Sequence, residues 1–225
     1  MNDKIQVAEN IERILSEING RARLLAATKT VPAEMINFAL GCGLDLIGEN
    51  RVNELLEKYE YIDRNKTELH FIGALQTNKV KYIMDKVSLI HSVDSVHLAE
   101  EISKQALNND LICNILLEVN IGSEESKTGF DKSAFLESLS RISELPNLNV
   151  KGIMTIPPIC DNEKELKNYF LKMSQYFNDI KEKGYKNFNM EILSMGMSGD
   201  YESAIECGAN LVRIGSLIYG ARIYK

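Results

Sequence analysis

The chain has 225 residues, of which 44% are hydrophobic and 26% are charged, and its formal net charge at pH 7 is −6. This length suits one large α/β domain, so we expect a single domain over residues 1–225. An acidic chain without a basic stripe is not suited to nucleic acid. The N-terminus begins a charged amphipathic stretch rather than a signal peptide, and no apolar run approaches the roughly 18 residues that span a bilayer. We therefore expect a cytoplasmic protein that binds neither nucleic acid nor a membrane.

Cysteines and histidines give no sign of a metal centre. The four cysteines lie far apart, with no C-x-x-C pair and no cluster with histidine. Paired carboxylates and a Ser/His/Asp arrangement are also not evident. We therefore predict no metal ligand and no catalytic residue from motifs.

A regular alternation of strands and helices runs along the chain. Hydrophobic residues at three- and four-residue spacing predict a helix over residues 5–18. Eight apolar runs follow as predicted strands, at residues 23–28, 44–48, 69–75, 87–93, 115–121, 150–156, 190–194 and 211–214. Helices are predicted between them, at residues 32–40, 52–62, 79–84, from about 95, 133–142, 163–181, near 204 and at the end of the chain. Continuously apolar strands indicate a parallel sheet. Eight such units predict a (β/α)₈ TIM barrel, with an open doubly wound sheet as the alternative.

Polar and glycine residues follow most of the predicted strands, and in such barrels functional groups lie at those carboxyl ends. Lys29 follows the largely apolar residues 24–28. An amine partly withdrawn from water loses its charge readily and becomes a nucleophile toward aldehydes. A surface lysine just past the end of a strand is the alternative interpretation.

A second group of candidates follows the last two strands. Gly215 and Ser216 can bring backbone N–H groups close to a phosphate, and Ser198 can add a hydroxyl. Two plain tight turns are the alternative. Arg213 lies within an apolar strand, where its charge needs a partner, and an ion pair with a nearby carboxylate is the simplest explanation. His70, on a predicted buried strand, is interpreted as a core residue.

Taken together, these segments resemble the pyridoxal phosphate homeostasis proteins, the family first described beside proline biosynthesis genes. The most specific matches are Gly48-Glu49-Asn50 and Gly196-Met197-Ser198. The resemblance extends over residues 27–30, 48–54, 70–79, 119–121, 125–129, 151–156, 193–200 and 213–222. It implies a barrel of the type found in the N-terminal domain of alanine racemase.

The resemblance also implies a cofactor and the residues that hold it. Pyridoxal 5′-phosphate (PLP) would form a Schiff base with Lys29. The other expected contacts are Asn50 and Met154 beside the ring, Arg213 at the pyridine nitrogen, and Ser198, Gly215 and Ser216 at the phosphate. Position 216 is often threonine in the family, and serine keeps the hydroxyl.

An arginine at the pyridine nitrogen can only donate a hydrogen bond, which makes the cofactor a poor electron sink. A racemase also needs a second acid or base, which in racemases comes from an added domain, and this chain ends directly after its eighth unit. We therefore expect a non-enzymatic, monomeric protein of vitamin B6 and amino-acid homeostasis that holds PLP and delivers it to apo-enzymes. A weak PLP-dependent racemase and a Schiff-base aldolase without PLP are the alternatives.

Overall fold

Eight parallel strands form a closed barrel, in which each strand pairs with its neighbours in the chain and the last strand pairs with the first. The strands are β1 (Arg23–Ala27), β2 (Leu46–Glu49), β3 (Glu68–Phe71), β4 (Leu89–Val93), β5 (Cys113–Glu118), β6 (Leu148–Met154), β7 (Phe188–Ser194) and β8 (Leu211–Ile214). Residues 23–26 of β1 pair in parallel with residues 211–214 of β8. This pairing closes the sheet, so the predicted (β/α)₈ barrel is confirmed and the doubly wound alternative is wrong.

This computed structural model describes residues 2–124, 128–160 and 162–221. Residues 125–127 and 222 belong to two of the stretches that resemble the homeostasis family, and they lie outside the described residues. Among the described residues, no helix is both long and apolar enough to cross a membrane.

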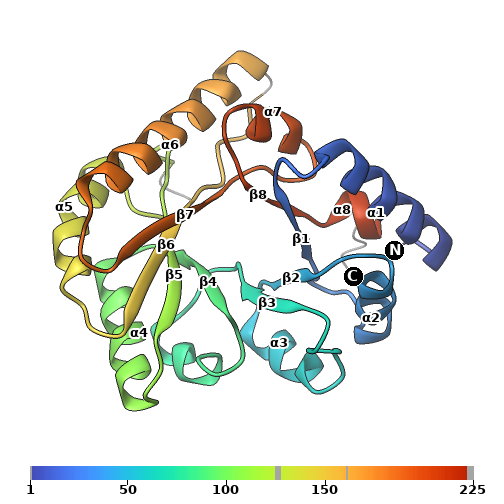
Figure 1. Cartoon of the computed structure of the whole chain (residues 1–225), viewed down its shortest axis with the longest axis horizontal. Coiled ribbons are helices and arrows are strands. Elements are labelled where there is room, and N and C mark those ends of the chain that lie inside the picture. Colours follow the sequence, from blue (N-terminus) through green and yellow to red (C-terminus); the bar gives the residue numbers. More distant parts are fainter. Residues whose placement is uncertain (1, 125–127, 161, 222–225) are drawn as a thin grey trace.

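A ring of helices surrounds the barrel (Figure 1). The helices are α1 (Lys4–Ile18), α2 (Ala33–Gly41), α3 (Val52–Tyr59), the 3₁₀ helix η1 (Thr77–Tyr82), α4 (Val96–Asn108), α5 (Lys132–Ser143), α6 (Glu163–Lys183), α7 (Tyr201–Glu206) and α8 (Ser216–Tyr219). Pro32 is the N-cap residue of α2. Ser95 is the N-cap residue of α4, and its side chain accepts a hydrogen bond from Leu98 N–H. Helix α1 lies beside α8, where the Asn10 side chain donates to the carbonyl of Ile218 at 3.1 Å.

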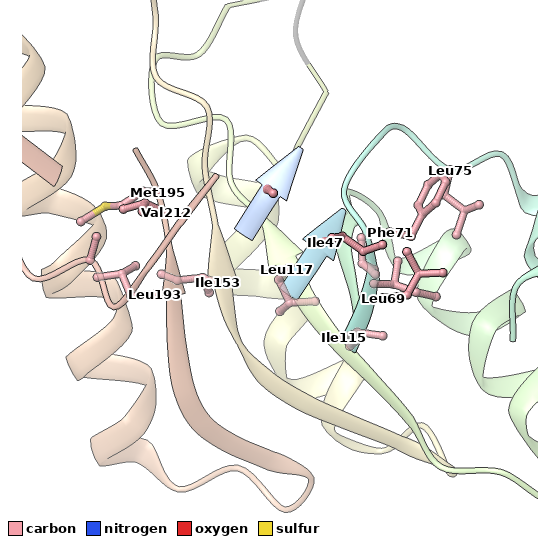
Figure 2. Close-up of a cluster of buried hydrophobic side chains, with 14 of the residues drawn as sticks. Ile47, Leu69, Phe71, Leu75, Ile115, Leu117, Ile153, Leu193, Met195 and Val212 are labelled. Atoms are coloured by element: carbon pink, nitrogen blue, oxygen red, sulfur yellow. The ribbon is translucent and has the colours of Figure 1, made fainter. Parts of the chain in front are cut away.

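Side chains of the strands alternate between two cores, because successive residues of a strand point to opposite faces. On β5, Ile115 and Leu117 belong to the large apolar core that also includes residues of the surrounding helices (Figure 2). Leu116 instead belongs to a small cluster with Leu89 and Met154. Burial on both faces explains why these strands are apolar throughout.

The apolar runs mark burial more closely than they mark strands. The third run was expected to be a strand over residues 69–75, but β3 ends at Phe71. Ile72 and Leu75 lie outside the strand and are nevertheless only 7% exposed. Residues 79–84, expected to form a helix, instead overlap the 3₁₀ helix η1.

Candidate functional site

Lys29 lies in the turn between β1 and α2 and is half-buried. The next residue, Thr30, has a positive φ of 65°, which is unusual for a β-branched residue and changes the chain direction directly after Lys29. The Thr30 backbone N–H donates to the carboxylate of Glu54, which holds this conformation. The backbone on the other side of Lys29 is fixed as well, because the Thr28 N–H donates to the Gly48 carbonyl at 2.9 Å.

A buried ion-pair network lies next to this turn. Glu49, at the end of β2, is fully buried, and its Oε1 atom accepts hydrogen bonds from Thr28 Oγ1 at 2.7 Å and from Lys58 Nζ at 3.0 Å. Lys58 also contacts Glu54 Oε1 at 2.7 Å and the Thr28 carbonyl at 2.9 Å. Burial raises the pKa of Glu49, and the charge of Lys58 acts in the opposite direction. Lys58 therefore ties both sides of the Lys29 turn to helix α3.

Asn50 follows β2 at the same rim, and a glycine on the neighbouring strand end gives it room. A Cβ atom at Gly73 would lie 2.0 Å from the backbone oxygen of Asn50. Such a distance is impossible, so only glycine allows the two segments to approach this closely. The Gly73 carbonyl also accepts a hydrogen bond from Ser92 Oγ at 2.5 Å.

The loops after β7 and β8 meet at Ser198. Its Oγ atom lies 3.4 Å from the backbone nitrogens of both Gly215 and Leu217 and accepts their hydrogen bonds. Gly215 is buried and Ser216 is exposed. Because the Ser198 oxygen accepts these hydrogen bonds, its hydroxyl proton remains available as a donor beside the turn after β8, at the position where barrels of this type often bind phosphate.

These segments surround one cavity of about 540 Å³, a size that falls within the range of small-molecule sites. Six of the seven predicted contact residues line it, namely Lys29, Asn50, Ser198, Arg213, Gly215 and Ser216. The remaining lining residues are Ala27, Ile72, Ile156, Met197, Gly199 and Ala221. Met154, the seventh predicted residue, is 1% exposed and packs against Leu89 and Leu116, so the structure does not place it in the lining.

Arg213 contributes a buried positive charge to this cavity. Its Nη1 atom donates to Ser194 Oγ at 2.7 Å and its Nη2 atom donates to the Thr155 carbonyl at 2.9 Å. Burial lowers the pKa of the guanidinium to about 10, while the carboxylates of Glu118 and Asp200 act in the opposite direction. The group therefore keeps its charge at neutral pH. We expected a direct ion pair between Arg213 and a carboxylate. The guanidinium instead donates to two neutral acceptors, and the two carboxylates lie farther away.

Sequence reasoning did not find several residues that organise this site. The Glu54 and Lys58 pair has the four-residue spacing of a helical ion pair, which is a readable signal. His91 also contacts both His70 and Ser194 inside the barrel. These contacts have no such signal, because the three residues lie on three different strands, β4, β3 and β7.

The barrel is of the alanine racemase type, because the family model described as "Alanine racemase, N-terminal domain" matches residues 3–223. A pyridoxal phosphate homeostasis protein from Aquifex aeolicus is 45% identical over 98% of this chain and 100% of its own length. The protein of the same name from Haemophilus influenzae is 37% identical over 97% of this chain and 94% of its own length. The chain belongs to the pyridoxal phosphate homeostasis protein family.

Solved structures agree with this assignment. A crystal structure described as that of "an unknown protein" from Bifidobacterium adolescentis superposes with a TM-score of 0.93 at 32% identity, covering 97% of both chains. PipY from Synechococcus elongatus with PLP bound superposes with a TM-score of 0.87 at 29% identity, covering 95% of this chain and 100% of that one. Alanine racemase from Streptomyces lavendulae shares the fold, with a TM-score of 0.79 at 16% identity, and the match covers 98% of this chain and 58% of the racemase.

Proposed function

We propose that this protein binds PLP as a Schiff base on Lys29, serves intracellular vitamin B6 and amino-acid homeostasis, and delivers PLP to apo-enzymes. The observation that carries the proposal is the meeting of Lys29, Arg213 and the Ser198 and Gly215 turns in the lining of one cavity. The names of the relatives and the PLP bound to PipY point to the same ligand.

The donors around the cavity fit PLP group by group. The Lys29 amine suits the aldehyde, and the Arg213 guanidinium suits an unprotonated ring nitrogen because it only donates. The hydroxyls of Ser198 and Ser216 and the backbone N–H of Gly215 suit the phosphate. Asn50 lies at the same rim and is expected beside the ring. Met154 does not line the cavity, and we expect it to support the site by its packing against Leu89 and Leu116.

The charges at the cavity favour binding over catalysis. PLP can serve as an electron sink in amino-acid chemistry, and a ring nitrogen that faces an arginine weakens this property. Among the described residues that line the cavity, the ionisable ones are Lys29 and Arg213. Lys29 is assigned to the Schiff base, and a guanidinium remains protonated. A racemase needs a further acid or base, so we assign a carrier rather than an enzyme.

A reversible imine suits storage and release, and this supports the delivery role. A carrier of this kind limits the reaction of the free aldehyde with other amines. We further propose that the protein acts in the cytoplasm as a monomer.

Attachment is tested by loading the purified protein with PLP, reducing it with borohydride and mapping the modified peptide. Reduction fixes an imine as a stable secondary amine, so the expected result is one pyridoxyl group on Lys29. Modification of another lysine, or of many lysines equally, would contradict the proposed attachment.

Delivery is tested by mixing the PLP-loaded protein with an apo-form of a PLP-dependent enzyme in the presence of an amine that traps free PLP. Direct transfer predicts that enzyme activity returns despite the trap. Free PLP at the same concentration as the protein-bound PLP should restore little activity under the same conditions. If the trap prevented reactivation equally by the PLP-loaded protein and by free PLP, the delivery role would be rejected and storage alone would remain.

A further inference from the structure

A chain of buried polar side chains extends from the cavity through the inside of the barrel. It begins at Arg213 on β8, whose Nη1 atom lies 2.7 Å from Ser194 Oγ on β7. The Ser194 hydroxyl lies 3.2 Å from Nδ1 of His91 on β4. Strands β4 and β7 are not neighbours in the sheet, so this contact crosses the barrel interior.

The chain continues to the opposite end of the barrel. Nε2 of His91 lies 2.9 Å from Nδ1 of His70 on β3. Nε2 of His70 lies 3.5 Å from Oε2 of Glu68, the first residue of β3. Glu68 is half-exposed and pairs with Arg23 at 3.2 Å. The chain therefore connects a buried guanidinium at the cavity with a carboxylate near solvent at the amino ends of the strands.

The groups at the two ends of this hydrogen-bond chain favour one direction for the hydrogen bonds between them. Arginine can only donate, so the Ser194 oxygen accepts from Arg213 and its hydroxyl is available to donate to Nδ1 of His91. Nδ1 of His91 is then an acceptor, and the ring carries its proton on Nε2. That proton is donated to Nδ1 of His70, which places the His70 proton on Nε2, facing the Glu68 carboxylate. A carboxylate only accepts, so the assignment closes without conflict.

We propose that Ser194, His91 and His70 form a one-directional hydrogen-bond chain, with both imidazoles neutral and protonated on Nε2, that positions the Arg213 guanidinium at the cavity. These are positioning residues, because Arg213 alone among the four lines the cavity. The chain fixes one side of the guanidinium by Ser194, and the Thr155 carbonyl fixes another nitrogen. The remaining N–H groups of the Arg213 guanidinium are thereby held in one orientation, toward a hydrogen-bond acceptor of a ligand in the cavity.

The opposite direction is unfavourable at both ends. If His91 carried its proton on Nδ1, the Ser194 oxygen could accept from both Arg213 and His91, but the Ser194 hydroxyl proton would lose the acceptor that Nδ1 of His91 provides. The lone pair of a neutral His70 would then face the carboxylate of Glu68. A doubly protonated His70 would resolve the second conflict, but burial lowers its pKa to about 4, despite the opposing effect of Glu68. Burial, His70 and Arg213 also hold the pKa of His91 well below its usual range.

The proposal is tested directly in the ligand-free protein by long-range ¹H–¹⁵N correlation spectra of ¹⁵N-labelled histidine at pH 7. The protein has three histidines, and His97 is exposed. A His97→Gln variant removes its signals and leaves only the two buried histidines to assign. The expected result is the neutral Nε2–H pattern for both His70 and His91. An Nδ1–H pattern or an imidazolium at either residue would overturn the proposal.

A second measurement follows the guanidinium itself. With its Nη atoms held by Ser194 and Thr155, Arg213 should give separate, slowly exchanging Nη signals. Ser194→Ala is expected to average these signals and to change the His91 pattern. Ser103→Ala is the matched control, since Ser103 is also a buried serine but lies on α4 and donates to the Pro146 carbonyl, away from the cavity. Equal effects of the two variants, or no effect of Ser194→Ala, would contradict the positioning role.

The link to PLP rests on the proposed function and is tested separately. Ser194→Ala in the PLP-loaded protein is expected to change the absorbance spectrum of the bound cofactor and its pH dependence, while Ser103→Ala leaves both unchanged. Failure of the native protein to bind PLP would overturn the proposed function, whereas the ligand-free spectra would still decide the proposed chain. If the native protein showed the Nε2–H pattern but Ser194→Ala left the cofactor spectrum unchanged, the hydrogen-bond chain would stand and only its effect on bound PLP would be rejected.

Discussion

Nδ1 of His70 lies 2.9 Å from Nε2 of His91, so a hydrogen bond joins two histidines on neighbouring strands inside the barrel. Both rings are buried, at 2% and 0% exposure. A pair of imidazoles in such a place is stable only while both are neutral, because protonation would bring a charge into the interior close to Arg213.

This pair predicts a loss of stability in acid. The pKa of His70 is lowered by burial from 6.5 to about 4, so the unfolded chain binds its proton first as the pH falls. The stabilisation is complete above about pH 6.5 and is lost as the pH falls toward 4. A pKa change of this size corresponds to about 3 kcal/mol. We expect His70→Gln to flatten the pH dependence of the unfolding free energy in this window, measured by urea denaturation.

The control for this experiment is His97→Gln, at an exposed site. Burial raises the pKa values of Glu49 and Glu118, so these two carboxylates favour the folded state at low pH and oppose the histidines. Comparison of each variant with the native protein removes their shared contribution. If both histidine variants had the same pH profile as the native protein, the assignment of the acid sensitivity to His70 would be wrong.

Replacement of Lys58 by methionine should destabilise the fold strongly at neutral pH. Glu49 is completely buried, and Lys58 is its cationic partner at 3.0 Å. Removing one member of a buried ion pair typically costs about 3–5 kcal/mol. Without Lys58 the pKa of Glu49 rises further, so the loss should shrink as the pH falls and Glu49 becomes protonated. Equilibrium unfolding at pH 7 and at pH 5 measures both effects.

A double-mutant cycle provides the control for Lys58. Lys58→Met combined with Glu49→Gln removes both charges, and we expect the double variant to be more stable than the sum of the single effects predicts. Strict additivity would show that the two side chains do not interact in the folded protein.

Gly73→Ala should disturb the site through the backbone. The new Cβ would lie 2.0 Å from the Asn50 carbonyl oxygen, and a backbone atom cannot move away as a flexible side chain can. Overpacking of this kind costs about 1–3 kcal/mol or more. We also expect weaker PLP retention, because Asn50 lines the cavity. Chemical denaturation and a PLP titration measure the two effects.

Gly199→Ala is the matched control on the same cavity, because nothing lies within 4 Å of the Cβ that it would add. It should leave the unfolding free energy within about 0.5 kcal/mol of the native value. A comparable loss in both variants would indicate that the close contact at Gly73 is not the cause.

Lys29→Ala should abolish the visible absorbance of bound PLP while the barrel stays folded. The side chain supplies the amine for the Schiff base, and the fold is built from residues elsewhere. Lys79→Ala, on η1, is the control and should keep the absorbance. Absorbance of the PLP-loaded protein and its far-UV circular dichroism are the measurements. A Lys29→Ala protein that retained the native band would refute the attachment.

The strand order and the rim position of the candidate residues could be predicted because they follow from local patterns. Each run is apolar at successive positions, which indicates a strand buried on both faces. The polar residues that follow the runs all belong to the same end of a parallel sheet. Strand ends were less accurate, as at Ile72, since burial continues past the last ladder hydrogen bond.

The sequence by itself determined the alternation of buried strands and helices. It placed Lys29, Asn50, Ser198, Gly215 and Ser216 after strands, and Arg213 within the last one. Only the tertiary structure decided which of these side chains share a cavity and what surrounds them. Arg213, Ser194, His91 and His70 are joined across the closed barrel by hydrogen bonds between different strands. Contacts of this kind depend on barrel closure, which brings together residues that no local pattern connects.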